Sequence, residues 1–264
     1  MAVHAHPDDE ASSTGGILAR YSDEGVRTVL VTCTRGELGD GPGGAKPGED
    51  GHDADAVAAT RREELAASCA VLGVSSLEML GYHDSGMAGW PQNDAPGSFW
   101  TTPVDEAAGR LASLVERYRP QVVVTYDDNG FYGHPDHIQA HRITVAALAA
   151  TDVAAKLYCT ALPRSSIARF ASLFAEDGVE VPDAEEFESI ATADELVTAR
   201  VDCSTVVGRK RAALAAHASQ MDNAFFLAIG EDRFAEVFAV ESFVQLSGPR
   251  GGAPPEQDLF AGVR

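Results

Sequence analysis

The chain has 264 residues, of which 45% are hydrophobic, and this size and composition allow one large soluble domain with a sizeable core. Its formal net charge of −20 disfavours nucleic acid as a partner, because phosphate binding needs clustered Lys and Arg. No apolar run is long enough to span a membrane and the first residues lack a secretory signal pattern, so we expect a cytoplasmic protein without a membrane partner.

The first 150 residues alternate short apolar segments with segments of helical periodicity. Strands are predicted at 1–5, 26–34, 77–80 and 121–126. Helices are predicted at 10–24, 60–72, 105–118 and 137–150. Two long segments rich in Gly, Pro and polar residues, 35–55 and 86–102, are predicted loops. This alternation predicts an α/β fold, a Rossmann-like open and mostly parallel sheet with helices on both faces.

The remainder of the chain, 151–264, is less regular, and we expect a small C-terminal α+β region that completes the substrate pocket. Its predicted elements are strands at 152–159, 195–203 (an edge strand) and 234–246, and helices at 167–177 and 206–220. The Pro- and Gly-rich tail after Gly248 is expected to wrap the surface. We therefore predict a catalytic core (1–150) and a C-terminal region (151–264) within one structural unit.

A first chemistry-bearing segment, His6-Pro7-Asp8-Asp9-Glu10, directly follows the first predicted strand. Open α/β sheets bind ligands at the carboxyl ends of their strands. Imidazole nitrogens and carboxylate oxygens are both good zinc ligands, and two adjacent acids allow one to bind metal while the other points elsewhere. Taken alone, the acids are equally consistent with a helix N-terminus, whose dipole favours negative charge.

A second such segment, Tyr126-Asp127-Asp128-Asn129-Gly130-Phe131-Tyr132-Gly133-His134-Pro135-Asp136-His137, runs from the end of the predicted strand at 121–126 to the start of the next helix. One polar loop of this kind would be unremarkable as a surface loop. Two strand-end loops that each carry His-Pro-Asp favour a shared metal site at one edge of the sheet. A catalytic zinc needs three protein ligands and an open position, which His6, Asp9 and His137 would provide. Fe²⁺ is the alternative ion for this donor set.

The remaining groups of the two segments suggest catalytic roles. Asp8, free of the metal, would remove a proton from water as general base. His134 would either stabilise the developing oxyanion or protonate the leaving amine. Asp136 would orient a histidine from behind.

Together, the segments HAHPDDE (4–10) and YGHPDH (132–137) resemble the LmbE/PIG-L family of zinc-dependent N-acetylglucosaminyl deacetylases. The similarity is greatest to its mycothiol-pathway members, a GlcNAc-inositol deacetylase and a mycothiol S-conjugate amidase. The resemblance implies that the chain hydrolyses the amide of a small N-acyl glucosamine. It implies the same metal ligands and base as above, and it assigns Tyr132 to polarise the substrate carbonyl.

The resemblance also implies substrate contacts. Arg61, in Arg61-Arg62-Glu63-Glu64-Leu65, would contact the sugar or inositol, and Asp84, in Asp84-Ser85-Gly86, would accept sugar hydroxyls. The alternative for Arg61 is an ordinary charge on a helix surface, and the alternative for Asp84 is an ordinary turn residue. Ser13 stands where the amidase carries Lys and favours the deacetylase. His217, in the segment HASQMD, resembles the amidase and is expected to line the pocket, with a surface helix position as the alternative.

Other functions were compared with this one. A deacetylase of an N-acyl aminosugar in natural-product biosynthesis is the alternative within the enzyme class. A dinucleotide-binding protein is disfavoured, because the first strand–helix turn has acids and no G-x-G-x-x-G. A non-catalytic sugar-binding module would not need the unliganded Asp8. A homo-oligomer stays open.

Overall fold

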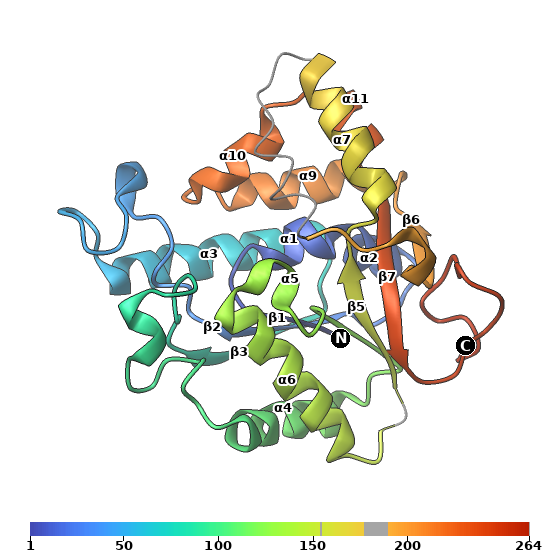
Figure 1. Cartoon of the computed structure of the whole chain (residues 1–264), viewed down its shortest axis with the longest axis horizontal. Coiled ribbons are helices and arrows are strands. Elements are labelled where there is room, and N and C mark those ends of the chain that lie inside the picture. Colours follow the sequence, from blue (N-terminus) through green and yellow to red (C-terminus); the bar gives the residue numbers. More distant parts are fainter. Residues whose placement is uncertain (154, 177–189, 264) are drawn as a thin grey trace.

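The computed structural model describes residues 1–153, 155–176 and 190–263. Its centre is a seven-stranded sheet in the order β3-β2-β1-β4-β5-β7-β6 (Figure 1). The strands are Ala2–His4 (β1), Val29–Thr34 (β2), Ser76–Tyr82 (β3), Val122–Thr125 (β4), Lys156–Ala161 (β5), Ala199–Asp202 (β6) and Val240–Ser247 (β7). Neighbouring strands from β3 to β5 run parallel, whereas β7 is antiparallel to both β5 and β6.

Helices cover both faces of this sheet. They are Asp9–Ser13 (α1), Gly15–Asp23 (α2), Ala54–Leu72 (α3), Val104–Tyr118 (α4), Gly130–Gly133 (α5), Pro135–Ala149 (α6), Arg164–Glu176 (α7), Val207–Ala216 (α9), Met221–Leu227 (α10) and Glu231–Phe238 (α11). Helices α3 and α9 lie on one side of the sheet, and α4 and α6 lie on the other (Figure 1). The predicted Rossmann-like α/β fold with a mostly parallel sheet is therefore confirmed.

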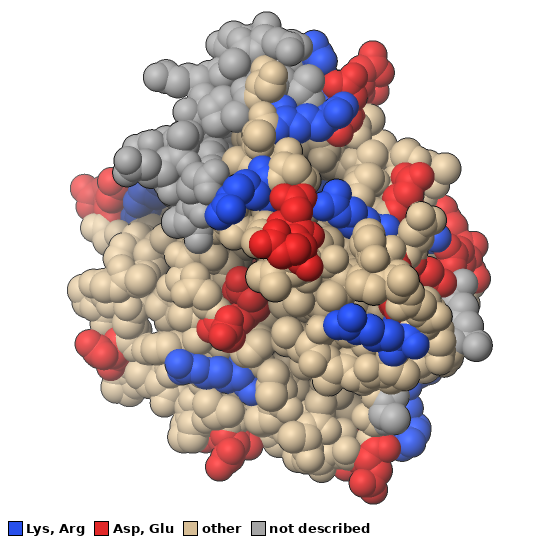
Figure 2. Space-filling model, turned by 45° about the vertical axis from the view of Figure 1, so that its right-hand side comes forward, with Lys and Arg blue, Asp and Glu red and all other residues tan. Residues whose placement is uncertain are grey.

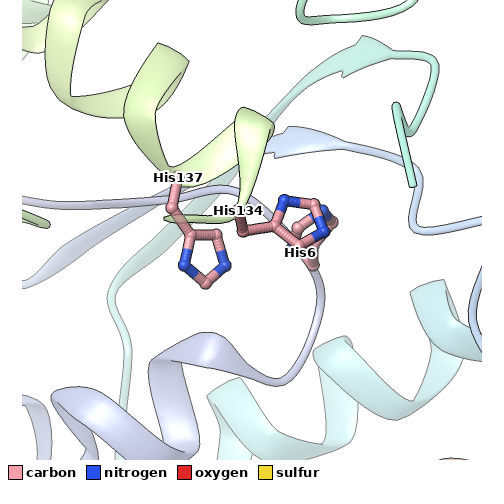
Figure 3. Close-up of side chains that lie close together, drawn as sticks. All are labelled: His6, His134 and His137. Atoms are coloured by element: carbon pink, nitrogen blue, oxygen red, sulfur yellow. The ribbon is translucent and has the colours of Figure 1, made fainter. Parts of the chain in front are cut away.

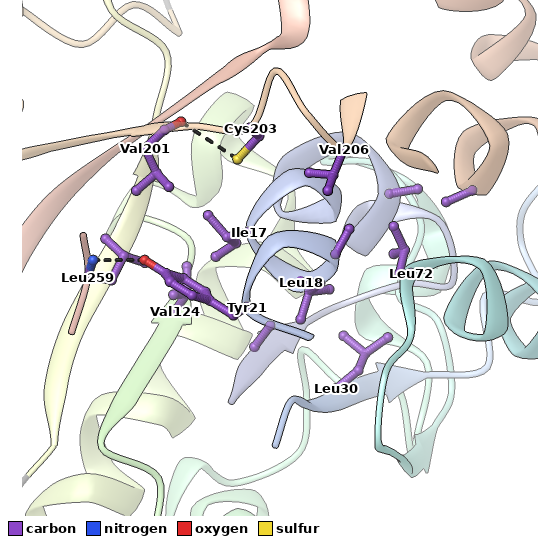
Figure 4. Close-up of a cluster of buried hydrophobic side chains, with 14 of the residues drawn as sticks. Ile17, Leu18, Tyr21, Leu30, Leu72, Val124, Val201, Cys203, Val206 and Leu259 are labelled. Carbon is purple, nitrogen blue, oxygen red and sulfur yellow. Dashed lines mark hydrogen bonds between the residues drawn. The ribbon is translucent and has the colours of Figure 1, made fainter. Parts of the chain in front are cut away.

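Two hydrophobic clusters fill the space between the sheet and its helices. Leu30 of β2 belongs to the cluster that includes Ile17 and Leu18 of α2 (Figure 4). Its neighbour Val31 belongs to the opposite cluster, with Leu111 of α4. Because successive strand side chains point to opposite faces, a strand covered on both sides is expected to be largely apolar, and all six residues of β2 are buried, including Thr32 and Thr34.

The helix predicted at 10–24 is in fact two helices that meet at Thr14, whose φ is −137°. The backbone N–H groups of Gly16 and Ile17 donate to the carboxylate of Glu241 in β7 at 2.7 and 2.8 Å. A side chain at Gly16 would not fit, since a Cβ there would lie 2.7 Å from Cβ of Cys203. A distant carboxylate thus satisfies the first N–H groups of α2, which local sequence cannot reveal.

Helix α3 begins at Ala54, six residues before its predicted start at Thr60. The side chain of Asp53 accepts hydrogen bonds from the N–H groups of Asp55 and Ala56 at 3.0 and 3.1 Å. This is an ordinary N-cap. The predicted loop 35–55 is correspondingly shorter at its end and contains one 3₁₀ turn, Pro42–Gly44.

The strand predicted at 234–246 is wrong over its first residues, which form the end of α11. Phe234, Val237 and Phe238 pack against the same hydrophobic cluster, and their spacing of three and four is helical. The helix predicted at 206–220 ends at Ala216, and α10 follows as a further helix. The predicted helix at 167–177 falls within α7 except for Asp177, which lies outside the described residues.

The C-terminal tail is held to strand β5 by Glu256. Oε2 of Glu256 accepts hydrogen bonds from Nζ of the buried Lys156 at 2.9 Å and from the hydroxyl of Tyr158 at 3.2 Å. Its other oxygen accepts from the N–H groups of Gly251 and Gly252 at 2.6 and 3.2 Å. Strands β5, β6 and β7 continue the sheet of residues 1–150, so both predicted regions share one sheet.

On the face shown in Figure 2, Asp and Glu side chains are interspersed with Lys and Arg. Among the described helices, none combines the length and the apolar character needed to cross a membrane.

Candidate active site

His6 lies just after the carboxyl end of β1, with its two ring nitrogens in different surroundings. Nε2 donates a hydrogen bond to Oδ2 of Asp136 at 3.2 Å. Nδ1 lies 3.4 Å from Oδ2 of Asp9. Because the proton is on the nitrogen that faces Asp136, the neutral ring keeps its lone pair on the Asp9 side. Although burial alone would lower the pKa of His6, the carboxylates of Asp84, Asp136 and Asp9 raise it well above its usual value, so a metal ion that binds Nδ1 would displace a proton from it.

His137, in the first turn of α6, faces the same carboxylate from the other side. Its Nδ1 donates to the carbonyl oxygen of Gly130 at 3.2 Å. Its Nε2, left with the lone pair, lies 3.5 Å from Oδ1 of Asp9. Within the described part of the chain this buried Nε2 has no hydrogen-bond partner. A buried polar atom without a partner is costly, which points to a ligand at this position.

These donor atoms fit a divalent metal ion. Of the three predicted ligands, Asp9 contacts the other two through different oxygens: its Oδ2 lies 3.4 Å from Nδ1 of His6, and its Oδ1 lies 3.5 Å from Nε2 of His137. His6, His134 and His137 also have ring nitrogens within 4.8 Å of one another (Figure 3). A second set, His6 with Asp84 and Asp136, shares His6 on its other side.

Asp9 is held in place by Tyr126, a residue that the sequence analysis missed. The Tyr126 hydroxyl donates to Oδ2 of Asp9 at 2.7 Å and accepts from the N–H of Ala5 at 2.8 Å. Its ring stacks on His137 with the centroids 4.1 Å apart. Burial would raise the pKa of Asp9, but His137 and His6 hold it well below its usual range, so the carboxylate is charged. The position of Tyr126 at the end of a predicted strand, as the first residue of the second segment, was the available signal.

Asp8, the predicted base, is the most accessible acid of the first segment. Its side chain is 22% exposed, whereas that of Asp9 is 14% exposed. Its Oδ2 lies 3.1 Å from a guanidinium nitrogen of Arg61, and its backbone N–H donates to Oε2 of Glu10 at 3.0 Å. Burial raises the pKa of Asp8 to about 6, against the opposing effect of Arg61. A carboxyl group with such a pKa is suited to proton transfer near neutral pH.

Two predicted substrate contacts are instead buried in protein contacts. Arg61 is only 4% exposed, and its guanidinium donates to the carbonyl oxygens of Pro7 and Gly36. His217 is 0% exposed, and its Nε2 donates to Oε1 of Glu10 at 2.7 Å. Arg61 therefore contacts the carboxylate of Asp8, and His217 contacts the carboxylate of Glu10. A sequence alone cannot distinguish such a buried polar residue from one that faces a ligand.

The other two predicted substrate-binding residues are Asp84, which lies near His6, and Ser13, which shares α1 with Asp9. Oδ1 of Asp84 accepts from the N–H of Gly86 at 2.8 Å and lies 3.7 Å from Nε2 of His6. Burial raises the pKa of Asp84, against the opposing effect of His6. Ser13 is half-buried and lies one helical turn after Asp9 on α1, which puts both residues on one side of that helix.

His134 precedes α6 and caps it. Its Nδ1 accepts a hydrogen bond from the N–H of Asp136 at 3.1 Å, which places the proton of the neutral ring on Nε2. Burial, together with the neighbouring His6 and His137, lowers the pKa of His134 to about 2. Tyr132 is 46% exposed, and its ring lies edge-on to His137 with the centroids 5.1 Å apart. Both side chains thus lie beside the three predicted ligands.

Comparison with known proteins places this geometry in context. Residues 1–148 match the family model described as GlcNAc-PI de-N-acetylase, PIG-L. A 1D-myo-inositol 2-acetamido-2-deoxy-alpha-D-glucopyranoside deacetylase from Acidothermus cellulolyticus is 44% identical over 278 residues, which cover 100% of this chain and 94% of that protein. A protein of the same name from Thermobifida fusca is also 44% identical, and the match covers 99% of this chain and 98% of that protein.

Solved structures share the fold at lower identity. The N,N'-diacetylchitobiose deacetylase of Pyrococcus horikoshii is 20% identical with a TM-score of 0.58, and the match covers 93% of this chain and 82% of that one. The 4-carboxy-2-hydroxymuconate hydratase GalB of Pseudomonas putida is 18% identical with a TM-score of 0.61, and the match covers 94% and 95%. Because one fold serves a deacetylase and a hydratase, the activity must be argued from the site.

Proposed function

This chain belongs to the GlcNAc-PI de-N-acetylase (PIG-L) family, and from that premise we propose that it hydrolyses the acetamide of an N-acetylglucosamine unit linked to inositol. Family membership makes it an amide-hydrolysing enzyme. The observation that carries the proposal is the close set of His6, Asp9 and His137 beside the more accessible carboxylate of Asp8. The two relatives that match almost the whole chain at 44% identity bear the name of this activity.

We propose Zn²⁺ as the resident ion, held by Nδ1 of His6, the carboxylate of Asp9 and Nε2 of His137. The unpartnered Nε2 of His137 supports this assignment. A bound divalent cation would supply Lewis-acid activation of the amide and of water. The hydrogen bonds of His6 to Asp136 and of His137 to Gly130 keep each ligating nitrogen free of its proton.

The side chains of the protein then divide the proton transfers and the charge stabilisation. Asp8 removes one proton from the attacking water, while the water oxygen adds to the amide carbon. His134 enters as a neutral ring with its proton on Nε2, which suits it to donate a hydrogen bond to the oxyanion rather than to protonate the amine. Tyr132, 46% exposed beside His137, would assist as a second donor. Asp8 then passes the proton that it took from water to the leaving nitrogen, the C–N bond breaks, and the products are acetate and the glucosamine amine.

The amidase reading has less support. His217 carried the resemblance to the mycothiol S-conjugate amidase, and its buried ring donates a hydrogen bond to Glu10. The half-buried Ser13, the deacetylase-like residue, lies beside Asp9 on α1.

The test is release of primary amine by the zinc-loaded protein from N-acetylglucosaminyl-inositol and from a mycothiol S-conjugate, measured side by side. We expect faster release from the first; faster release from the second would overturn the substrate assignment. Asp8→Ala should abolish turnover with zinc still bound, and loss of zinc together with activity would remove Asp8 as the base. His137→Ala should lower the zinc content, and full occupancy would remove His137 from the ligands.

A further inference from the structure

The backbone of Asp8 has a conformation that needs outside support. Its φ is 116°, in the region that residues with a side chain rarely adopt. The residue lies between Pro7, which has a fixed φ, and the first residue of α1. A strained position of this kind persists only where surrounding contacts hold it. The direction of the Asp8 carboxylate depends on this conformation, since the backbone sets where Cβ points.

The backbone contact that holds Asp8 comes from Glu10. The N–H of Asp8 donates to Oε2 of Glu10 at 3.0 Å. The other oxygen, Oε1, accepts from Nε2 of His217 at 2.7 Å and from the hydroxyl of Ser68. Glu10, Ser68 and His217 are all fully buried, so the carboxylate is fixed from α3 on one side and from the end of α9 on the other.

The side chains of Glu10 and His217 are both completely buried. A hydrogen bond from a backbone N–H to a carboxylate is shorter and stronger than one between neutral groups, so this pair suits the task of holding a strained backbone.

From this geometry we propose that Glu10, anchored by His217, is a positioning residue that holds Asp8 in the orientation needed for proton removal. The proposal rests on the proposed function, because it takes Asp8 as the base. Arg61 contacts the Asp8 side chain, whereas Glu10 contacts its backbone, so the two act on different parts of one residue. Through His217, a residue of the C-terminal region, that region contributes to catalysis without touching the substrate.

Glu10 should act on turnover more than on binding. The three metal ligands have anchors of their own, namely Tyr126 for Asp9, Asp136 for His6 and Gly130 for His137. Glu10 makes none of these contacts. We therefore expect Glu10→Ala to keep its zinc and its KM within about threefold, while kcat falls about 100-fold, the loss typical of a misplaced catalytic group.

Conservative variants of Glu10 and His217 test whether kcat depends on the hydrogen bonds of these side chains. Glu10→Gln keeps an oxygen for the Asp8 N–H and offers an N–H to His217, so it should regain most of the kcat lost in Glu10→Ala. His217→Gln keeps a donor toward Glu10 and should exceed His217→Ala in kcat. The matched control is Glu241→Ala, which removes another buried carboxylate that accepts two backbone N–H groups. At a temperature where it is folded, this control should keep its kcat.

The proposal is overturned if Glu10→Ala keeps its kcat, if KM alone rises, if zinc is lost, or if Glu241→Ala loses as much kcat. Crystal structures of the unaltered chain and of Glu10→Ala give a readout that does not depend on substrate. Asp8 should leave the positive-φ region in the variant, and an unchanged Asp8 would refute the positioning role. If the unaltered chain releases no amine, the proposed function fails, while these two structures still decide the role of Glu10.

Discussion

The ion pair between Lys210 and Glu241 provides a stringent test of how this fold is held together. Both side chains are buried, with Nζ of Lys210 2.6 Å from Oε1 of Glu241. The same carboxylate accepts the N–H groups of Gly16 and Ile17 at the start of α2. Replacing Glu241 with Ala would leave a buried ammonium and two backbone donors without their acceptor, so we expect a large loss of stability.

The size of that loss of stability can be estimated from the cost of breaking a buried ion pair. Removing one member of a buried ion pair costs about 3–5 kcal/mol in the free energy of unfolding. For a chain of this size, each kcal/mol lowers the midpoint of thermal unfolding by about 2–4 °C. Glu241→Ala should therefore lower the midpoint by roughly 6–20 °C, measured by circular dichroism.

Two further variants separate charge from packing. Lys210→Met combined with Glu241→Leu leaves no unpaired charge and should regain at least half of the lost midpoint, since apolar replacement of a buried pair is often neutral. Glu236→Ala breaks the exposed pair with Arg233 and should cost less than about 1 kcal/mol. If Glu241→Ala destabilises no more than Glu236→Ala does, the reasoning about the buried pair is refuted.

Three other outcomes are expected. Gly16→Ala should cost about 1–3 kcal/mol in chemical denaturation, because its Cβ would lie 2.9 Å from Cδ of Glu241, and an unchanged midpoint would contradict this close approach. Asp136→Asn should weaken zinc binding about 10–100-fold in a chelator competition, because the carboxylate orients His6; equal affinity would argue against that role. Burial would raise the pKa of Glu256, but Lys156 and nearby N–H groups lower it. The ionised Glu256 therefore stabilises the folded chain fully above the unfolded pKa of about 4.3, and this stabilisation is lost as the pH falls through the lower pKa of the folded state. The stability difference between the unaltered chain and Glu256→Gln should thus shrink in acid, and a pH-independent difference would contradict it.

The sequence predicted the parts of the site that depend on local pattern. The ends of two apolar strands, each followed by His-Pro-Asp, placed His6, Asp9 and His137 at one edge of a parallel sheet, and the structure brings them together. The sheet itself followed from the alternation of strands and helices. These features depend on residues close in sequence, whose periodicity is visible without a structure.

The features that the sequence did not predict depend on distant partners. His217 and Glu10 are 207 positions apart, so the burial of either side chain could not be inferred from its neighbours. Glu10 looked like an ordinary acid at a helix start, and Arg61 like a ligand contact, because charge says nothing about which group neutralises it. The break between α1 and α2 likewise depends on Glu241, which belongs to the last strand.

The strand order has a consequence for how this site can change in evolution. The chain leaves β1 toward β2 and β3 on one side, and later leaves β4 toward β5 on the other. Strands β1 and β4 are neighbours, so the topological switch point of the sheet, where open α/β sheets bind ligands, lies between them. The predicted metal ligands come from the segments that follow these two strands: His6 and Asp9 follow β1 closely, and His137 lies in the first turn of α6. The long segments after β2 and β3 can therefore vary in length and sequence, and alter which sugar is admitted, without displacing the groups that cleave the amide.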